Sequence, residues 1–138
     1  MKSPQLTFPP HTVSVHPNGS EVAVGGKDMK VHLYTLANGQ LTASKELTGH
    51  RGEVTTVAYS PDGTYIASGD SNREVLVWKD GAAVVSGWVF HTARVNAVAW
   101  SPDNVHVASV STDANLIVWN VANPNTRIIV KSTSYLSF

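Results

Sequence analysis

The chain has 138 residues, of which 42% are hydrophobic and 14% charged, so its composition supplies enough apolar material for the core of one domain. Its ten basic and ten acidic residues cancel, which argues against nucleic acid and membrane surfaces as partners, because proteins that bind them usually carry a basic excess. The absence of cysteine excludes disulfide bonds and thiolate metal sites, and no apolar run approaches transmembrane length. We therefore expect a soluble intracellular protein.

One pattern of residues occurs three times, as VSVHPNGSEVAVGGKDMKVHLY, VAYSPDGTYIASGDSNREVLVW and VAWSPDNVHVASVSTDANLIVW. The turns that begin at His16, Ser60 and Ser101 are 44 and 41 residues apart. The same two separations relate the aromatic residues that close the copies, which are Tyr34, Trp78 and Trp119. Two independent landmarks with the same spacing establish a repeat.

The predicted elements follow the same order in each repeat. In the middle copy, Val54–Tyr59, Tyr65–Gly69 and Glu74–Trp78 are short, rich in Val, Ile and aromatic residues, and bounded by turn residues, which predicts three strands. Ser60-Pro61-Asp62-Gly63 fits a type I turn, because proline pre-sets the second position and glycine is favoured at the fourth. A weaker fourth strand follows each closing aromatic residue, at Gln40–Leu47, Ala82–Ser86 and Arg127–Lys131.

Four short antiparallel strands in a unit of about 40 residues are typical of one blade of a β-propeller. The strands are apolar on both sides, as Val22, Ala23 and Val24 illustrate, and packing between two neighbouring blades explains this. A β-sandwich, the alternative, would show cleaner alternation. We predict an all-β fold of three four-stranded antiparallel blades, at about 11–48, 49–87 and 88–131.

Three blades form an open arc, because propellers typically have four to eight. Both end faces of such an arc would expose apolar surface that neighbouring blades normally cover. We therefore expect an incomplete propeller that is a fragment of a longer protein, or that forms a homo-oligomer to bury its open faces. Residues 1–10 and 132–138 are interpreted as remnants of adjoining strands, with Gln5–Phe8 as an outer strand and Tyr135–Phe138 as the start of a fourth repeat.

The pair Gly49-His50, the turn Ser60-Pro61-Asp62-Gly63 and the closing Trp78 resemble a WD repeat, and the likeness covers nearly the whole chain. In WD repeats a hydrogen-bond network joins tryptophan, serine, histidine and aspartate. The resemblance implies such a network in the third copy, from His91, Ser109, Asp113 and Trp119. The second copy keeps His50, Ser68 and Trp78 but has Asn72 at the aspartate position, and the first keeps Asp28, with Tyr34 in place of tryptophan.

The residue types in the third copy are also those of a hydrolase triad, with Ser109 as nucleophile, His91 as base and Asp113 as the orienting group. Two observations favour the structural network. A buried indole N–H needs an acceptor, which makes Trp119 a natural fourth partner, and the sequence contains no GxSxG nucleophile motif. We expect no enzymatic activity.

The six histidines form no convincing metal site, because the nearest pair, His11 and His16, would lie on opposite faces of a strand. We expect neither a metal nor another cofactor. Lys27, Arg51, Arg73 and Arg94 fall in loops that lead into or between strands, where propellers place their binding surfaces. They are candidate partner-binding residues; the alternative is ordinary solvated loop charge.

Three segments are similar, in the same order, to the carboxy-terminal propeller of the actin-interacting protein 1 family. They are VSVHPNGSEVAVGGKDMKVHLY, VTTVAYSPDGTYIASGD and FHTARVNAVAWSPDNVHVASVSTDANLIVWNVANPNTRI, of which SPDN and NPNTR are the more particular features. The chain departs from the family at IIVKSTSYLSF, which does not continue into a full repeat.

The resemblance implies a cytoplasmic, cytoskeletal protein-interaction module that binds actin filaments decorated with cofilin and promotes their disassembly. Two other interpretations stay open. The chain could belong to a general WD-repeat scaffold unrelated to actin, or it could be a fragment without a function of its own.

Overall fold

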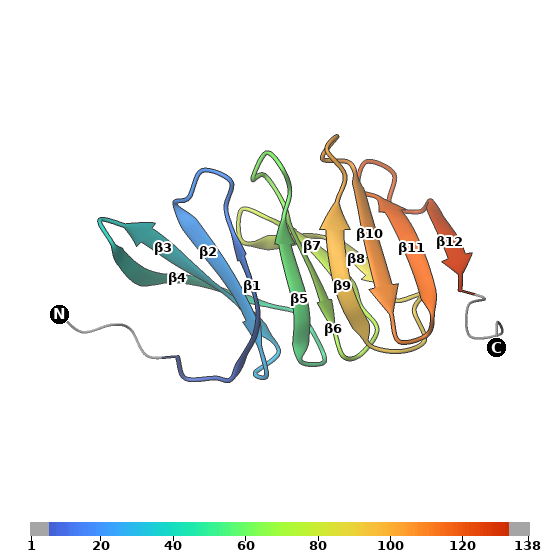
Figure 1. The fold of residues 1–138 in the computed structure, drawn as a ribbon, viewed down its shortest axis with the longest axis horizontal. Helices are drawn as coiled ribbons and strands as arrows, with labels where there is room; N and C mark the ends of the chain where they lie inside the picture. Colours follow the sequence, from blue (N-terminus) through green and yellow to red (C-terminus); the bar gives the residue numbers. More distant parts are fainter. Residues whose placement is uncertain (1–5, 133–138) are drawn as a thin grey trace.

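The computed structural model describes residues 6–132, which form three four-stranded sheets (Figure 1). These residues contain no helix, and so no helical segment that could span a membrane. The first sheet consists of β1 (Pro10–Val15), β2 (Glu21–Gly26), β3 (Lys30–Ala37) and β4 (Gln40–Thr48). The second consists of β5 (Val54–Tyr59), β6 (Ile66–Asp70), β7 (Val75–Lys79) and β8 (Ala82–Trp88). The third consists of β9 (Val95–Trp100), β10 (His106–Ser111), β11 (Asn115–Asn120) and β12 (Arg127–Lys131).

Each sheet is an antiparallel meander in which the strands pair in chain order. The sheets lie side by side, with β1 against β5 and β5 against β9, and they fan out without closing into a ring (Figure 1). This arrangement confirms the predicted all-β fold of three four-stranded blades in an incomplete propeller. The sheets span residues 10–48, 54–88 and 95–131, beside the expected blades at 11–48, 49–87 and 88–131.

The first turn of each sheet has the geometry that its sequence predicts. In the second sheet the Gly63 N–H donates to the Ser60 carbonyl over 2.9 Å, and Gly63 has a φ of 77°. Asn104 takes the same place in the third sheet with a φ of 62°. The turn between the second and third strands also repeats, and its left-handed residue is never glycine. That residue is Met29, Arg73 or Ala114, with φ of 69°, 78° and 68°.

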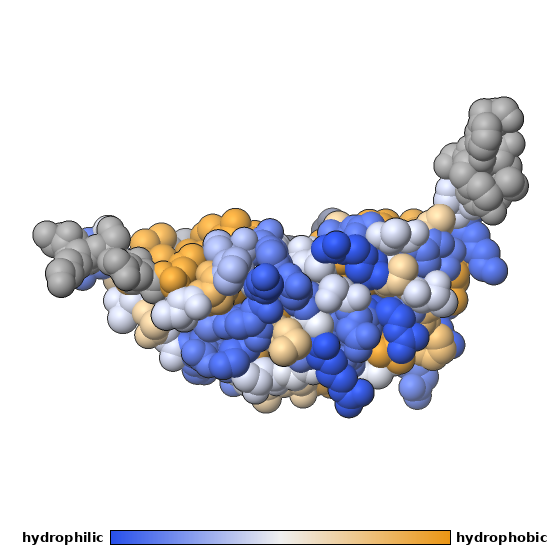
Figure 2. All heavy atoms as spheres, turned by 90° about the horizontal axis from the view of Figure 1, so that it is seen from below, coloured by the Kyte–Doolittle hydropathy of each residue, from blue (hydrophilic) through white to orange (hydrophobic). Residues whose placement is uncertain are grey.

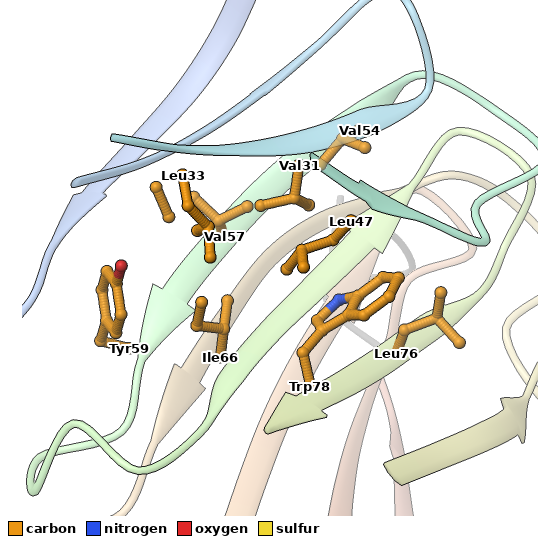
Figure 3. Packing of buried hydrophobic residues seen from close by; sticks show 10 residues of the cluster. Val31, Leu33, Leu47, Val54, Val57, Tyr59, Ile66, Leu76 and Trp78 are labelled. Atoms are coloured by element: carbon orange, nitrogen blue, oxygen red, sulfur yellow. The ribbon is translucent and has the colours of Figure 1, made fainter. Parts of the chain in front are cut away.

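The apolar core lies between the sheets, in two clusters. The first cluster joins the first and second sheets, and Figure 3 shows Val31 and Leu33 of β3 pointing toward Val57 of β5. The second cluster joins the second and third sheets around Trp88 and Trp119, whose rings stack with centroids 4.7 Å apart. Both faces of the second sheet are therefore covered, which explains why its strands are apolar on both sides.

The sheets approach so closely that two positions require glycine. A Cβ atom on Gly25 would lie 2.4 Å from Val54 Cγ1, and one on Gly69 would lie 2.5 Å from Val95 Cγ1. At the corresponding place in the third sheet stands Val110, which is 41% exposed on the open face. The outer face of the third sheet thus differs in shape from the two faces that pack inside the arc.

Hydroxyl groups also join the sheets. β5 and β9 are edge strands, so the backbone N–H groups on their free side lack a partner in their own sheet. Thr12 Oγ1 accepts the Val57 N–H over 3.2 Å, and Thr56 Oγ1 accepts the Val98 N–H over 3.2 Å. Ala97, which pairs with Val110, occupies the same place in the third sheet and offers no acceptor.

The amino-terminal segment differs from the expected strand remnant. Leu6 to Pro9 form no strand, and Phe8 instead stacks on His32 with ring centroids 4.0 Å apart. Burial of the Phe8 ring, together with two prolines that have no N–H to donate, accounts for the difference. Gln5 lies outside the described residues, as does the expected carboxy-terminal remnant apart from Ser132.

Candidate functional site

The third sheet brings together the four residues of the predicted network. The Trp119 indole N–H donates to Ser109 Oγ over 2.9 Å, and Ser109 Oγ lies 2.8 Å from His91 Nε2. His91 Nδ1 lies 2.9 Å from Asp113 Oδ2. Ser109 and Trp119 sit on paired strands, whereas His91 and Asp113 come from the β8–β9 loop and the β10–β11 turn. The network therefore ties two loops to the sheet.

Two groups at the ends of the network have fixed roles. An indole nitrogen only donates, so the Ser109 oxygen accepts from Trp119, and an ionised carboxylate such as Asp113 only accepts. With a neutral imidazole between them, His91 Nε2 takes the hydroxyl hydrogen of Ser109. His91 Nδ1–H then donates to Asp113, and every member of the network has its partners. Ser109 is 1% exposed, so its hydroxyl is not presented to a substrate. The geometry supports scaffolding and gives the hydrolase interpretation no accessible nucleophile.

The second sheet has the same network with a different aspartate. Trp78 donates to Ser68 Oγ over 2.8 Å, and Ser68 Oγ lies 2.6 Å from His50 Nε2. The partner of His50 Nδ1 is Asp70 Oδ2, at 2.6 Å, and not Asn72, so the prediction for Asn72 was wrong. Asn72 is exposed, and its backbone N–H donates to Asp70 Oδ1.

The reason lies in the β6–β7 turn. Asp70 ends β6, two residues before the position of Asn72, and its carboxylate is still within reach of the histidine. Its second oxygen accepts the backbone N–H groups of Asn72 and Glu74, over 2.8 and 3.0 Å. An aspartate at either of two turn positions can thus complete the network. The spacing Ser68-Gly69-Asp70 was the signal that could have identified it.

The first sheet replaces the network with apolar packing. Val24 occupies the serine position, and it forms a buried cluster with Phe8 and Tyr34. The place of Asp28 in the repeat implied a polar network with Tyr34, and this prediction was wrong. Asp28 Oδ2 instead lies 2.8 Å from His32 Nε2. Because the first sheet has no histidine at the usual place, a serine there would have lacked a partner, and an apolar side chain avoids that cost.

Both network aspartates favour their charged form. Burial alone would raise the pKa of Asp70, but hydrogen bonds from His50 and from the turn N–H groups outweigh it and hold that pKa below its usual range. Asp113 has the same balance: burial opposes ionisation, while the Thr92 N–H and His91 lower its pKa. Each carboxylate is therefore a fixed negative charge within a polar, hydrogen-bonded pocket.

The four candidate partner-binding cations share one edge of the molecule, which we call the basic edge. Lys27 lies in the β2–β3 turn, Arg51 in the β4–β5 loop, Arg73 in the β6–β7 turn and Arg94 in the β8–β9 loop. These connections run along the lower edge of the arc in Figure 1, and Figure 2 views the molecule from that side as a largely hydrophilic face. All four side chains are exposed, and within residues 6–132 none forms an ion pair or side-chain hydrogen bond.

Removal of Asp70 tests the corrected network. We expect Asp70→Ala to lower the free energy of unfolding by about 1–3 kcal/mol, because it leaves a buried histidine nitrogen without its acceptor. Asn72→Ala, the matched control two residues away, should change it by no more than about 0.5 kcal/mol. Urea unfolding followed by tryptophan fluorescence measures both. Equal losses in the two variants would contradict the assignment.

The lowered pKa of Asp70 also predicts a pH dependence. The folded-state pKa lies below the unfolded value of about 3.9, so the stabilisation is complete above that value and is lost as the pH falls through the folded pKa. Asp70→Asn should therefore be less stable than the wild type near neutral pH, with a difference that shrinks below about pH 4. Urea titrations between neutral and acid pH measure this, and a difference that stays constant would refute it.

Comparison with known proteins agrees with the repeated sheets. Residues 2–35, 41–79 and 84–120 match the family model described as WD domain, G-beta repeat. The solved structure titled "Structure of U3-55K" superposes with a TM-score of 0.84 over 94% of this chain and 41% of that chain. At 23% sequence identity, this likeness shows a shared fold.

Among curated relatives, actin-interacting protein 1 of Drosophila melanogaster is 43% identical over 92% of this chain and 21% of its own length. Actin-interacting protein 1-2 of Arabidopsis thaliana is 42% identical over 53% of this chain and 12% of its own length. The 66 kDa stress protein of Physarum polycephalum is 46% identical over 64% of this chain and 15% of its own. The chain thus spans about a fifth or less of these relatives. The three matched segments each contain the first two strands of one sheet and all or most of the third, and they cover more than half of the chain, which therefore belongs to the WD-repeat family.

Proposed function

We propose that this chain is a protein-interaction module of an actin-binding WD-repeat protein that acts with cofilin in the disassembly of actin filaments. The observation that carries the proposal is the 43% identity, over 92% of the chain, to a protein named actin-interacting protein 1. The role of cofilin and a cytoplasmic, cytoskeletal location follow from the family resemblance of the sequence.

The basic edge is the contact surface that we favour. Its cations are exposed and lack partners among the described residues, so they are available to an acidic surface. The buried networks support this choice because they fix the loops that carry the cations. His50 precedes Arg51 directly, and Asp113 accepts the Thr92 N–H two residues before Arg94. Loops that are already ordered lose less conformational entropy on binding.

Co-sedimentation with actin filaments tests the proposal. We expect the chain to pellet with filaments, and to do so more strongly when cofilin is present. The double variants Lys27→Glu/Arg94→Glu and Arg51→Glu/Arg73→Glu should each weaken pelleting, because charge reversal on a contact surface creates repulsion with an acidic partner.

The matched control is Lys45→Glu/Lys79→Glu, which changes the same number of charges away from the basic edge. It should pellet like the wild type. Failure of the chain to pellet under any condition would favour the general WD-repeat scaffold. Pelleting that is indifferent to both basic-edge variants would remove the basic edge as the contact.

The open faces support self-association as part of the same proposal. On β1, Val13 and Val15 are 62% and 55% exposed, and on β12 Ile128 and Val130 are 63% and 51% exposed. Figure 2 shows apolar surface at both ends of the molecule. Exposed apolar patches of this kind favour association, because burying them releases ordered water.

Light scattering on the purified chain measures this association. We expect an average mass above that of the monomer that rises with concentration. Val13→Lys and Ile128→Lys should return the mass toward the monomer, because each places a charge in the contact. A compact, folded monomer at all working concentrations would contradict the proposal.

A further inference from the structure

A groove of about 470 Å³ opens at the basic edge beside the second sheet. Its lining includes Gly49 and Arg51 from the β4–β5 loop, Arg73 from the β6–β7 turn, and Leu76, Gly87 and Val89. Small residues keep it open. Gly49 and Gly87 have no side chain, and a Cβ atom on Gly87 would meet nothing within 4 Å.

The third sheet shows what fits the corresponding place. Phe90 precedes His91 there, as Gly49 precedes His50 in the second sheet. The Phe90 ring lies 6.1 Å from the Trp119 ring, centroid to centroid, and the Arg127 guanidinium lies 3.5 Å from the Phe90 centroid. In the second sheet a Cβ on Gly49 would already lie 3.2 Å from Trp78 Cη2. The position before the network histidine thus carries an aromatic ring in the third sheet, whereas in the second sheet it is a glycine that lines the groove.

Two arginines line the groove. Within residues 6–132, neither Arg51 nor Arg73 has an ion-pair or side-chain hydrogen-bond partner. Among the described residues of the lining, Glu74 is the one acidic residue, and its Oε2 accepts the Gly87 N–H over 3.4 Å. Two arginines against one glutamate leave the lining with a net positive charge. An arginine guanidinium can both pair with carboxylates and stack on aromatic rings, so these two residues could hold a ligand that carries either group.

The backbone on both sides of the groove is held in place. The His50–Asp70 bond at 2.6 Å joins the β4–β5 loop to the β6–β7 turn, and Asp70 Oδ1 accepts the N–H groups that precede and follow Arg73. The two arginines therefore project from backbone that the buried network already orders. Binding of a partner would therefore cost little conformational entropy in these loops.

We propose that this groove binds an acidic peptide segment of a partner protein, with one aromatic side chain inserted next to Gly49, against Leu76 and Val89, and carboxylates paired with Arg51 and Arg73. The aromatic ring would lie next to the position that carries Phe90 in the third sheet. The inference rests on the geometry of the second sheet and holds whether or not the partner is actin. It also divides the basic edge: Arg51 and Arg73 form a site, whereas Lys27 and Arg94 contribute charge.

Fluorescence anisotropy with synthetic peptides tests the inference on the 138-residue chain. The probe is a fluorescein-labelled peptide with one phenylalanine flanked by glutamates. One control peptide replaces phenylalanine with alanine, and the other replaces the glutamates with glutamines. We expect the probe to bind about tenfold or more tightly than either control, because anchoring aromatic groups and charge pairs dominate such contacts.

Two protein variants locate the site. Arg51→Gln/Arg73→Gln changes only exposed side chains and should weaken probe binding about tenfold or more. Gly49→Phe copies the third sheet and should block the groove. Because Gly49→Phe must displace atoms of Trp78 by a few tenths of an ångström, its thermal melt is measured in parallel, and the arginine variant decides if the fold is lost. Lys45→Gln/Lys79→Gln, the matched control, should bind like the wild type.

Equal affinity for the three peptides, or full binding by the arginine variant, would overturn the inference. These readouts contain no actin, so they are separate from the test of the proposed function. A chain that binds the probe but does not pellet with filaments keeps the groove and loses actin as the partner. A chain that pellets but ignores the probe keeps actin and loses the groove.

Discussion

The sheets of this molecule are apolar on both faces, and the need to cover those faces governs the whole molecule. The second sheet meets it on both sides, through the two apolar clusters and through hydroxyl groups that satisfy the N–H groups of β5 and β9. Gly25 and Gly69 allow the approach, since any larger residue would collide with the valine of the next sheet. The first and third sheets meet the requirement on one side each.

The buried polar networks solve a second problem, which is how loops at the edge of thin sheets stay ordered. Each network starts at a tryptophan inside the sheet and ends at an aspartate at the end of the second strand or in the turn after it, so that the position of the loop depends on the core. Such a network is favourable only when every member is satisfied, and all members are satisfied in the second and third sheets. The first sheet lacks the histidine and uses Phe8, Val24 and Tyr34 instead.

The repeat, the strands and the first turns could be predicted from the sequence, because each depends on residues close together in the chain or at a fixed spacing, and the network of the third sheet was implied by the resemblance to WD repeats. Sequence reasoning missed Asp70 because two turn positions reach the same histidine, a fact of geometry that residue spacing does not reveal. It missed the packing of Phe8 because an apolar substitute for a polar network has no motif. The groove depends on Gly49, which has no side chain where the third sheet has Phe90. The sequence alone does not reveal the groove, because it appears only when the folded second and third sheets are compared.

Val110 makes the open face of the third sheet different from the faces that pack inside the arc. If the first sheet of one copy met the third sheet of another as neighbours meet inside the chain, the contact would be head-to-tail, and it would add further copies in series unless the rotation between copies closed a ring. The third sheet offers a valine where that contact needs a glycine, and Ala97 where it needs a hydroxyl. Stacking of copies in series is thereby disfavoured, and pairing through like faces, which closes on itself after two copies, becomes the easier way to cover the exposed ends.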